Sequence, residues 1–220
     1  MKLHPLIADA AAVIFDFDGV LVDSEPLHEK AIKRVAAARG WTMTEDHFQQ
    51  MVGKGDDHAF ELLARDHRVR VTPREVAEMC EDKHQACLEL IRAGEFAVQP
   101  GAEALVQTVS AQRPTGVCSG SRRDVVHGML EACGLMPFMR TVVTHEDVVN
   151  PKPHPEGYLL AAARLGAKPE RCLVIEDSPT GIRAGKAAGM RVVAVQHSFD
   201  AERLQEADVI MRAIVDLVAR

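Results

Sequence analysis

The 220-residue sequence has no excess of positive charge and no apolar run long enough to span a membrane. Its 26 Lys and Arg residues are outnumbered by 32 Asp and Glu residues, so the formal net charge is −6. General nucleic-acid binders and binders of anionic membranes need the opposite balance, so neither class is expected. Any positive potential for an anionic ligand must be local. The first residues, Met-Lys-Leu-His-Pro-Leu, are too short and too broken to form a signal peptide.

The cysteines lack the spacing of disulfide frameworks and of zinc sites. They number five, an odd count, and include no CxxC pair. We therefore expect reduced thiols that mostly fill the core of a cytoplasmic protein. Cys118 lies within a strand pattern, so packing is expected of it and not reactivity. The sequence has no internal repeat and no low-complexity tract, and no motif in it indicates a protein partner.

The most informative stretch is Phe15-Asp16-Phe17-Asp18-Gly19-Val20, which follows an apolar run. Such a run is typical of a buried parallel strand, and residues i and i+2 of a strand point to the same side. Asp16 and Asp18 are thus expected at the carboxyl end of a strand, where open α/β sheets bind ligands. Two adjacent carboxylates repel each other unless a cation or a shared proton lies between them, and Mg²⁺ suits oxygen ligands. An ordinary Asp-Gly turn is the alternative interpretation.

Three further polar motifs each follow an apolar run. Ser119-Gly120-Ser121 precedes a helical pattern, where a hydroxyl and unpaired backbone N–H groups can hold an anion. Lys152 lies between two prolines, which restrict its backbone as a fixed charge against phosphate requires. Glu176 and Asp177 end the last of these runs before another helix. Taken singly, these are a turn, a surface lysine and a helix N-cap. Their joint occurrence at strand ends favours one site.

With these motifs the sequence resembles the haloacid dehalogenase superfamily of phosphohydrolases, in the subgroup of β-phosphoglucomutase and the small sugar-phosphate phosphatases. The resemblance spans nearly the whole chain. It implies that Asp16 is the nucleophile that forms an aspartyl-phosphate and that Asp18 is the general acid/base. Dehalogenases of the superfamily have no use for an acid at the position of Asp18, so its presence favours phosphoryl transfer. The motifs that carry the resemblance are Asp16-Phe17-Asp18-Gly19-Val20, Ser119, Lys152 and Glu176-Asp177.

The resemblance also implies the remaining roles in the site. Ser119 and Lys152 would hold the transferring phosphoryl group. The ligands of Mg²⁺ would be Asp16, the backbone carbonyl of Asp18 and Asp177, with Glu176 in or beside the metal shell. Mg²⁺ and the lysine would then cancel the repulsion between the attacking carboxylate and the anionic phosphate.

The periodic patterns predict an α/β fold: a Rossmann-like three-layer core, similar to that of the superfamily, with a parallel sheet and helices on both faces. After the first strand the pattern stays helical for some seventy residues before strands resume. We interpret this block, residues 23–95, as an inserted α-helical cap domain in a core formed by residues 1–22 and 96–220. Strands are expected at 11–15, 115–118, 141–143, 172–175, 192–195 and 208–211, and cap helices at 26–39, 44–51, 57–65 and 73–92.

Substrate choice is expected to depend on the cap. Lys54 lies between Gly53 and Gly55 at the expected tip of a loop, where it can reach a substrate or remain a solvated lysine. His28 stands at the spacing where a mutase of this family has a cap histidine, although a surface histidine fits equally well. In the core, Ser121 and Arg122 directly follow Ser119 and are candidates for contact with the leaving group. The helix of small residues at 180–189 is expected to pack close to the sheet and is assigned no catalytic role.

The function expected from the sequence is Mg²⁺-dependent hydrolysis of a small phosphorylated metabolite, with a sugar phosphate as the first choice. A β-phosphoglucomutase-like isomerase is the first alternative. Asp56 counts against it, because it stands near the position of a mutase arginine and would repel a second phosphate. A non-catalytic phosphometabolite-binding protein is the second alternative. The complete motif set argues against it, because a retired site has no need of two uncompensated carboxylates.

Overall fold

The structure is a computed structural model that describes residues 2–51 and 54–219. Gly53, expected at the tip of the cap loop, lies outside the described residues. The chain forms two compact units, which we call the core unit (Met1–Asp23 with Ala97–Arg220) and the helical unit (Ser24–Phe96). Each is described by itself below. No described helix is long and apolar enough to cross a membrane.

The core unit contains a six-stranded sheet in the order β6-β5-β2-β7-β8-β9, with every neighbouring pair parallel. This confirms the expected α/β fold with a parallel sheet. All four residues of β2 and all five of β7 are buried, which is why these strands are continuous apolar runs. The strands are β2 (Ala12–Phe15), β5 (Thr115–Cys118), β6 (Thr141–Val143), β7 (Cys172–Glu176), β8 (Arg191–Val195) and β9 (Val209–Met211).

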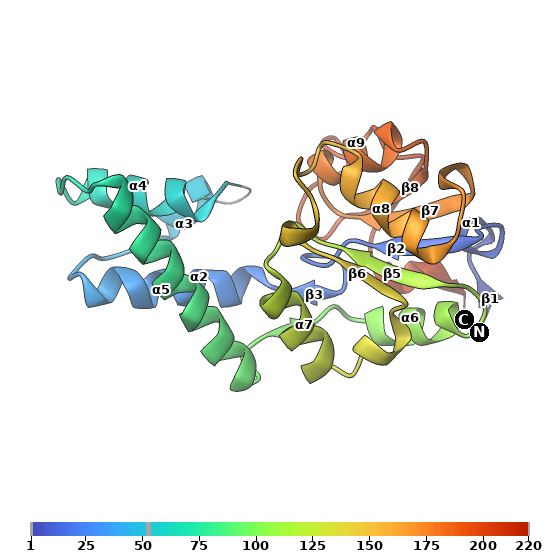
Figure 1. Cartoon of the computed structure of the whole chain (residues 1–220), viewed down its shortest axis with the longest axis horizontal. Coiled ribbons are helices and arrows are strands. Elements are labelled where there is room, and N and C mark those ends of the chain that lie inside the picture. Colours follow the sequence, from blue (N-terminus) through green and yellow to red (C-terminus); the bar gives the residue numbers. More distant parts are fainter. Residues whose placement is uncertain (1, 52–53, 220) are drawn as a thin grey trace. The chain divides into compact units, whose positions relative to one another are not determined.

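Helices cover both faces of this sheet, as Figure 1 shows: α8 and α9 lie on one face, and α6 and α7 on the other. The core unit therefore has the three layers that the sequence predicts. A short helix, α1, follows the first residues and was not expected. The bounds are α1 (Pro5–Ala8), α6 (Ala102–Ser110), α7 (Arg123–Ala132), α8 (Glu156–Leu165) and α9 (Pro179–Ala187).

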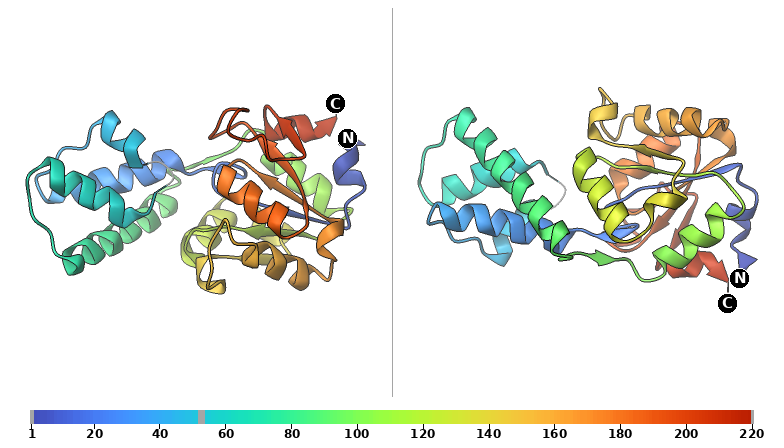
Figure 2. Two further views of the ribbon diagram at one scale, coloured as in Figure 1. Left: turned by 90° about the horizontal axis from the view of Figure 1, so that it is seen from above. Right: turned by 60° about the horizontal axis from the view of Figure 1, so that its bottom comes forward.

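Two small antiparallel pairs complete the core unit. β3 (Val22–Asp23) pairs with β4 (Ala97–Val98) where the chain leaves the core unit and returns to it. β1 (Lys2–Leu3) pairs with β10 (Val218–Ala219), so the two ends of the chain lie side by side (Figure 2). Neither pair was expected, because strands of two residues give no periodic signal in the sequence.

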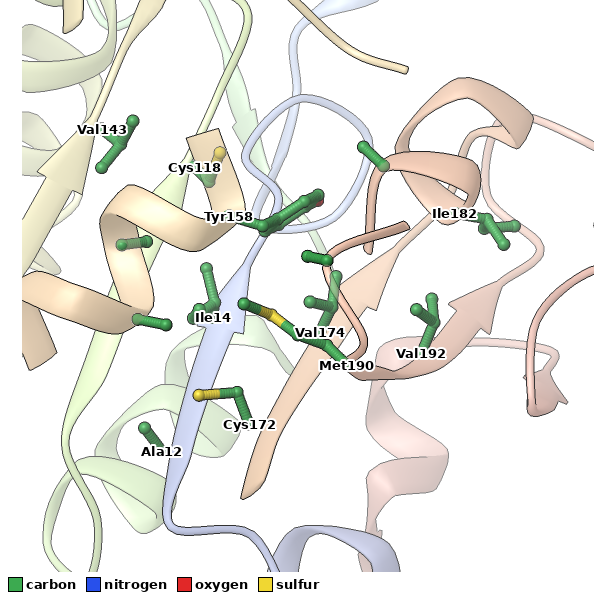
Figure 3. Packing of buried hydrophobic residues seen from close by; sticks show 14 of the residues in the cluster. Ala12, Ile14, Cys118, Val143, Tyr158, Cys172, Val174, Ile182, Met190 and Val192 are labelled. Atoms are coloured by element: carbon green, nitrogen blue, oxygen red, sulfur yellow. The ribbon is translucent and has the colours of Figure 1, made fainter. Parts of the chain in front are cut away.

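The hydrophobic core between the sheet and helices α8 and α9 fixes the strands that carry the polar motifs. Ile14 of β2 and Val174 of β7 are paired across the sheet, and both are fully buried with Tyr158 of α8. Figure 3 shows these side chains within one cluster, together with Cys118 and Cys172. Both cysteines are buried, and none of the five cysteines is part of a disulfide, as expected. Burial raises the pKa of Cys118 to about 12, so its thiol stays protonated.

The helical unit has a hydrophobic core of its own and contains the four helices that the sequence predicts, with no end shifted by more than one residue. The start of the last helix is set by a capping box. Thr72 Oγ1 accepts a hydrogen bond from Glu75 N, and Glu75 Oε2 accepts one from Thr72 N. The helices are α2 (Glu25–Ala38), α3 (Glu45–Met51), α4 (Asp56–Asp66) and α5 (Pro73–Arg92).

Candidate active site

Three neighbouring strands end side by side at one edge of the sheet, and a polar motif follows or ends each of them. Phe15 of β2 pairs with Ile175 of β7 on one side and with Val117 of β5 on the other. Asp16 continues the ladder, because its N–H donates to the carbonyl of Ile175 at 2.8 Å. The sheet register therefore brings Asp16 next to Glu176 and places the start of the Ser119 loop at the same edge.

Lys152 reaches this edge from the loop that precedes α8. Its Nζ atom lies 2.5 Å from Asp16 Oδ1 and 2.8 Å from Glu176 Oε1, and 4.9 Å from the centre of the Tyr158 ring. The loop is held by Glu156, whose carboxylate accepts hydrogen bonds from backbone N–H groups at 149 and 150. The contacts of the Lys152 side chain and the hydrogen bonds of its loop together fix the position of the ammonium group. The prolines on both sides of Lys152 predicted such a fixed position.

Negative charge exceeds positive charge in this buried space. Asp16, Glu176 and Asp177 each offer a carboxylate oxygen, and these oxygens lie within 4.8 Å of one another. Burial and the charge of Glu176 raise the pKa of Asp16, and they raise the pKa of Asp177 to about 7. Burial would lower the pKa of Lys152, but the carboxylates of Asp16 and Glu176 raise it well above its usual value. One ammonium among three carboxylates leaves a deficit of positive charge that a divalent cation fits.

The hydrogen bonds decide which carboxylates fit a metal best. Glu176 accepts five hydrogen bonds, whereas a carboxylate has about four lone-pair sites. Among the described residues, no group donates to Oδ2 of Asp16 or to Oδ1 of Asp177. These two residues therefore fit a hard cation as direct ligands, and Glu176 fits a place beside it. The five donors to Glu176 are Lys152 Nζ, Tyr158 Oη, Asp177 N, Ser178 N and Ser178 Oγ.

The same bonds control the charge of Glu176. Burial alone would raise the pKa of this carboxyl, but Lys152 and the hydrogen bonds from Ser178 hold it below the usual value. Glu176 is fully buried, so an ionised state there requires these partners.

Asp18 lies with the two serines of the β5 loop. Its Oδ2 atom accepts hydrogen bonds from Ser121 Oγ at 2.7 Å and from Ser119 Oγ at 3.1 Å. Ser119 Oγ in turn accepts one from the backbone N–H of Ser121 at 2.9 Å. The structure thus brings together three sequence-predicted residues, with Ser121 contacting the Asp18 carboxylate. Arg122 is exposed at the N-cap of α7.

Two glycines make room for the carboxylates. Gly19 has φ +76°, and a Cβ atom on it would collide with Oδ2 of Asp177. Gly181, at the start of α9, lies so close to Glu176 that a Cβ atom would overlap the carboxylate. The small residues of this helix were expected to let it pack close to the sheet, and Gly181 confirms this. Any larger residue at this position would displace Glu176.

Three further residues of the site were missed from the sequence. Tyr158 is fully buried, and its hydroxyl donates to Glu176 Oε1 at 3.0 Å. Ser198 Oγ donates to Asp177 Oδ2, and His197 Nδ1 lies 2.7 Å from the carbonyl oxygen of Gly19. His197 and Ser198 follow β8, so their place after a strand end was the signal that could have found them.

The two candidate residues of the helical unit are Lys54 in the segment before α4 and His28 on α2. Lys54 is exposed just before α4, and its Nζ atom lies 3.2 Å from His58 Nε2. His28 lies on α2, with Nδ1 3.7 Å from Cys87 Sγ.

An ion pair that the sequence did not reveal joins α4 to α5. Lys83 Nζ lies 2.9 Å and 3.0 Å from the two carboxylate oxygens of Asp56. The side chain of Lys83 is only 8% exposed. The charge of Asp56, on which the argument against an isomerase relies, is therefore compensated by a buried lysine.

Comparison with known proteins gives a consistent result. A family model described as haloacid dehalogenase-like hydrolase matches residues 10–189. Validoxylamine A 7′-phosphate phosphatase from Streptomyces hygroscopicus subsp. limoneus is 32% identical over 205 residues, which cover 93% of this chain and 94% of that protein. Fructose-1-phosphate phosphatase YqaB from Escherichia coli is 30% identical over 191 residues, which cover 84% and 96% of the two chains.

Solved structures agree in fold. β-Phosphoglucomutase from Clostridium difficile superposes with a TM-score of 0.78 at 26% identity, covering 95% of this chain and 93% of that one. CbbY from Rhodobacter sphaeroides, in complex with phosphate, also gives a TM-score of 0.78 at 26% identity, with coverages of 94% and 96%.

Proposed function

The chain belongs to the haloacid dehalogenase-like hydrolases and is a phosphoric monoester hydrolase, and from this premise we propose that it is a Mg²⁺-dependent phosphatase of small phosphorylated sugars that acts through an aspartyl-phosphate. The observation that carries the proposal is the contact of Lys152 with Asp16 and Glu176 inside a buried cluster of three carboxylates. The phosphatases of phosphorylated sugars among the relatives support the substrate class.

In the first step Asp16 is the nucleophile. One of its carboxylate oxygens attacks phosphorus, and the bond from phosphorus to the sugar oxygen breaks. Lys152 and the hydroxyl of Ser119 hold the phosphoryl oxygens while charge builds on them. Asp18 donates a proton to the leaving sugar oxygen, so the sugar departs as a neutral alcohol and Asp16 carries the phosphoryl group.

In the second step Asp18 works in the opposite direction. It takes a proton from a water molecule, whose oxygen attacks the phosphorus of the aspartyl-phosphate. The acyl-phosphate bond breaks, inorganic phosphate leaves, and the Asp16 carboxylate is regenerated. The hydroxyl of Ser121 donates to Asp18 Oδ2 and thereby orients it for both proton transfers. The hydroxyl of Ser119, which contacts the same oxygen without substrate, would turn to the phosphoryl group when substrate binds.

Three groups of this chain would hold the metal: the carboxylates of Asp16 and Asp177 and the backbone carbonyl of Asp18. Their oxygen chemistry and the excess of negative charge fit Mg²⁺. When bound, Mg²⁺ supplies positive charge that offsets the repulsion between the carboxylate and the phosphate. Glu176 acts beside the metal by holding Lys152.

The helical unit acts as the cap in this proposal and selects the substrate. Lys54 and His28 are its candidate substrate contacts, and Ser121 and Arg122 are those of the core unit. The likeness to β-phosphoglucomutase favours a second candidate function, a phosphosugar isomerase that uses the same aspartyl-phosphate.

A substrate panel tests the proposal. The wild-type protein is incubated with sugar phosphates and other small phosphate esters, with Mg²⁺ or with EDTA, and released phosphate is measured. We expect turnover of at least one sugar phosphate that EDTA abolishes and Mg²⁺ restores. Conversion of β-glucose 1-phosphate, primed with bisphosphate, into the 6-phosphate without phosphate release would favour the isomerase. No turnover of any ester would refute both and favour a non-catalytic binding protein.

A further inference from the structure

A fifth polar segment lies at the same edge of the sheet as the four motifs. β8 ends at Val195, and His197 and Ser198 follow two and three residues later. β8 is parallel to β7, with Ala194 opposite Glu176. The carboxyl end of β8 therefore lies beside the Glu176-Asp177 motif, where a side chain after the strand can contact it.

Ser198 contacts the carboxylate of Asp177. Its hydroxyl donates to Oδ2, and no other described residue donates to this carboxylate. Asp177 is 3% exposed, and a buried carboxylate that lacks donors is costly and poorly oriented. The hydroxyl of Ser198 thus fixes Oδ2 and leaves Oδ1 without a donor among the described residues.

His197 joins the same segment to the loop of the nucleophile. Its Nε2 atom accepts a hydrogen bond from the backbone N–H of Ile214 at 3.3 Å, so Nε2 carries no proton. The proton of the neutral ring is then on Nδ1, which donates to the carbonyl oxygen of Gly19 at 2.7 Å. The two contacts together fix both the tautomer and the orientation of the ring.

The contact of Ser198 with Asp177 and the contact of His197 with the nucleophile loop meet at Gly19. A Cβ atom on Gly19 would collide with Asp177 Oδ2 and lie 2.6 Å from Ser198 Oγ. The backbone after Asp18, the carboxylate of Asp177 and the hydroxyl of Ser198 are therefore packed directly against one another. A shift of the β8 segment would move the groups that we assign to the metal.

The segment is anchored on its other side by the core. Phe199 packs against the hydrophobic cluster of the core unit, and the guanidinium of Arg203 lies 4.2 Å from the centre of its ring. The backbone N–H of Gln196 donates to the carbonyl of Met211, which extends the pairing of β8 with β9. Ser198 and His197 thus project from a fixed support, as groups that orient a catalytic carboxylate require.

We propose that His197 and Ser198 are positioning residues of the catalytic site. Ser198 orients Asp177 as a metal ligand, and His197 holds the Gly19 carbonyl and with it the backbone that follows Asp18. The proposal rests on the function proposed above. It assigns to this chain a fifth element of the site, outside the four motifs.

Removal of the Ser198 hydroxyl tests the first part. Mg²⁺ binding is measured by isothermal titration calorimetry in the absence of substrate for wild type, Ser198→Ala and Ser198→Thr. We expect Ser198→Ala to bind Mg²⁺ roughly tenfold more weakly and Ser198→Thr, which keeps a hydroxyl, to recover most of the affinity. Ser110→Ala is the matched control, because Ser110 is also partly buried but its hydroxyl donates, among the described residues, to a carbonyl of its own helix.

Exchange of His197 tests the second part. His197→Asn keeps an N–H near the position of Nδ1, whereas His197→Phe keeps a ring without any donor. We expect kcat of His197→Phe to fall roughly tenfold with KM little changed, and His197→Asn to regain most of it.

The outcomes separate this proposal from the proposed function. If wild type binds Mg²⁺ and hydrolyses sugar phosphates while Ser198→Ala binds Mg²⁺ as wild type does, the positioning role of Ser198 is wrong. Equal loss in both His197 variants overturns the role of its N–H group. A variant that does not fold counts against the proposal if its Thr or Asn counterpart also fails to fold, because the segment is then needed for folding alone. Absence of Mg²⁺ binding and of turnover in wild type refutes the proposed function itself.

Discussion

Lys152 Nζ lies 2.5 Å from Asp16 Oδ1, although 136 positions separate the two residues in the chain. The contact combines the two charges that the proposed chemistry needs, a nucleophile and the cation that holds the phosphate. Without substrate the ammonium compensates part of the negative charge of the carboxylates. An arriving phosphoryl group would meet a donor that is already in place, so little reorganisation is needed as the reaction proceeds.

Asp16→Asn tests the nucleophile. The amide has nearly the same shape as the carboxylate, so the variant should fold, but it cannot form an acyl-phosphate and it weakens the metal site. We expect the rate of phosphate release to fall by several orders of magnitude, with the circular dichroism spectrum unchanged. Retention of even a tenth of the wild-type turnover, a loss of only about 1.4 kcal/mol in transition-state stabilisation, would contradict the assignment.

Asp18→Asn and Asp177→Asn test the division between proton transfer and metal binding. Asp18 would serve the metal only through its backbone, so its amide variant should bind Mg²⁺ nearly as wild type does while kcat collapses. Asp177→Asn should instead require much more Mg²⁺ for half-maximal activity. Titration of binding and activity against Mg²⁺ for both variants is the measurement. Equal shifts in metal affinity would show that the two roles are not separated.

Tyr158→Phe isolates one hydroxyl of the support around Glu176. The ring that packs against Lys152 is kept, and Glu176 loses one of its five donors. We expect a loss of about 1 kcal/mol in unfolding free energy, measured with urea, and a fall of less than tenfold in kcat. Tyr158→Ala, which also opens a cavity in a fully buried site, should cost several kcal/mol more. Complete loss of activity in Tyr158→Phe would instead place the hydroxyl in the chemistry.

The residues of this sheet edge that could be predicted from the sequence follow or end a continuous apolar run, except Lys152, which the prolines on both sides of it indicated. Asp16 and Asp177 stand out because a buried strand is readable from its residues, and parallel strands end at a common edge. Tyr158 gave no such signal, because an aromatic residue on a helix usually fills a core, and its hydrogen bond to Glu176 depends on packing across the sheet. Ser198 follows a predicted strand but is a common loop residue.

Ion pairs between residues far apart in the sequence could not be predicted either. Lys83 follows Asp56 by 27 positions and comes from another helix, so no local pattern relates the two. Gly181 was interpreted as a packing residue because small residues in a helix usually are. Only the position of the Glu176 carboxylate shows that the lack of a side chain at Gly181 makes room for this group.

Asp147 gives the fold a pH dependence away from the carboxylate cluster of Asp16, Glu176 and Asp177. Burial alone would raise its pKa, but hydrogen bonds from Arg164 and from Thr144 lower the pKa well below its usual range. A carboxyl whose pKa is depressed in the folded state adds stability above its unfolded pKa, about 4. That stability is lost as the pH falls toward the folded value.

Asp147→Asn should therefore lower the unfolding free energy by about 1 kcal/mol at pH 7, after allowance for solvent near the arginine. The difference from wild type should shrink steadily as the pH falls below about 4. Urea unfolding at a series of pH values measures both quantities. A difference that stays constant down to pH 2 would mean that the ionised carboxylate does not contribute.

Lys54→Ala tests whether the helical unit selects the substrate. The lysine is exposed, and its described contact is with His58, so its removal should leave the fold intact. If Lys54 binds the non-reacting part of the sugar phosphate, the variant should raise KM for the best substrate several-fold or change the ranking of substrates. It should spare p-nitrophenyl phosphate, which lacks that part.

Two other lysines give this experiment its contrast. Lys152→Ala acts on the transferring phosphoryl group and should reduce turnover of every ester alike, including p-nitrophenyl phosphate. Lys33→Ala removes an exposed lysine of the same helical unit that pairs with Glu29, and should change no kinetic constant. If Lys54→Ala behaves like Lys33→Ala on the best sugar phosphate, Lys54 is a solvated loop residue. Selection by the helical unit must then depend on other groups, and the ion pair of Asp56 with the buried Lys83 is the next to exchange.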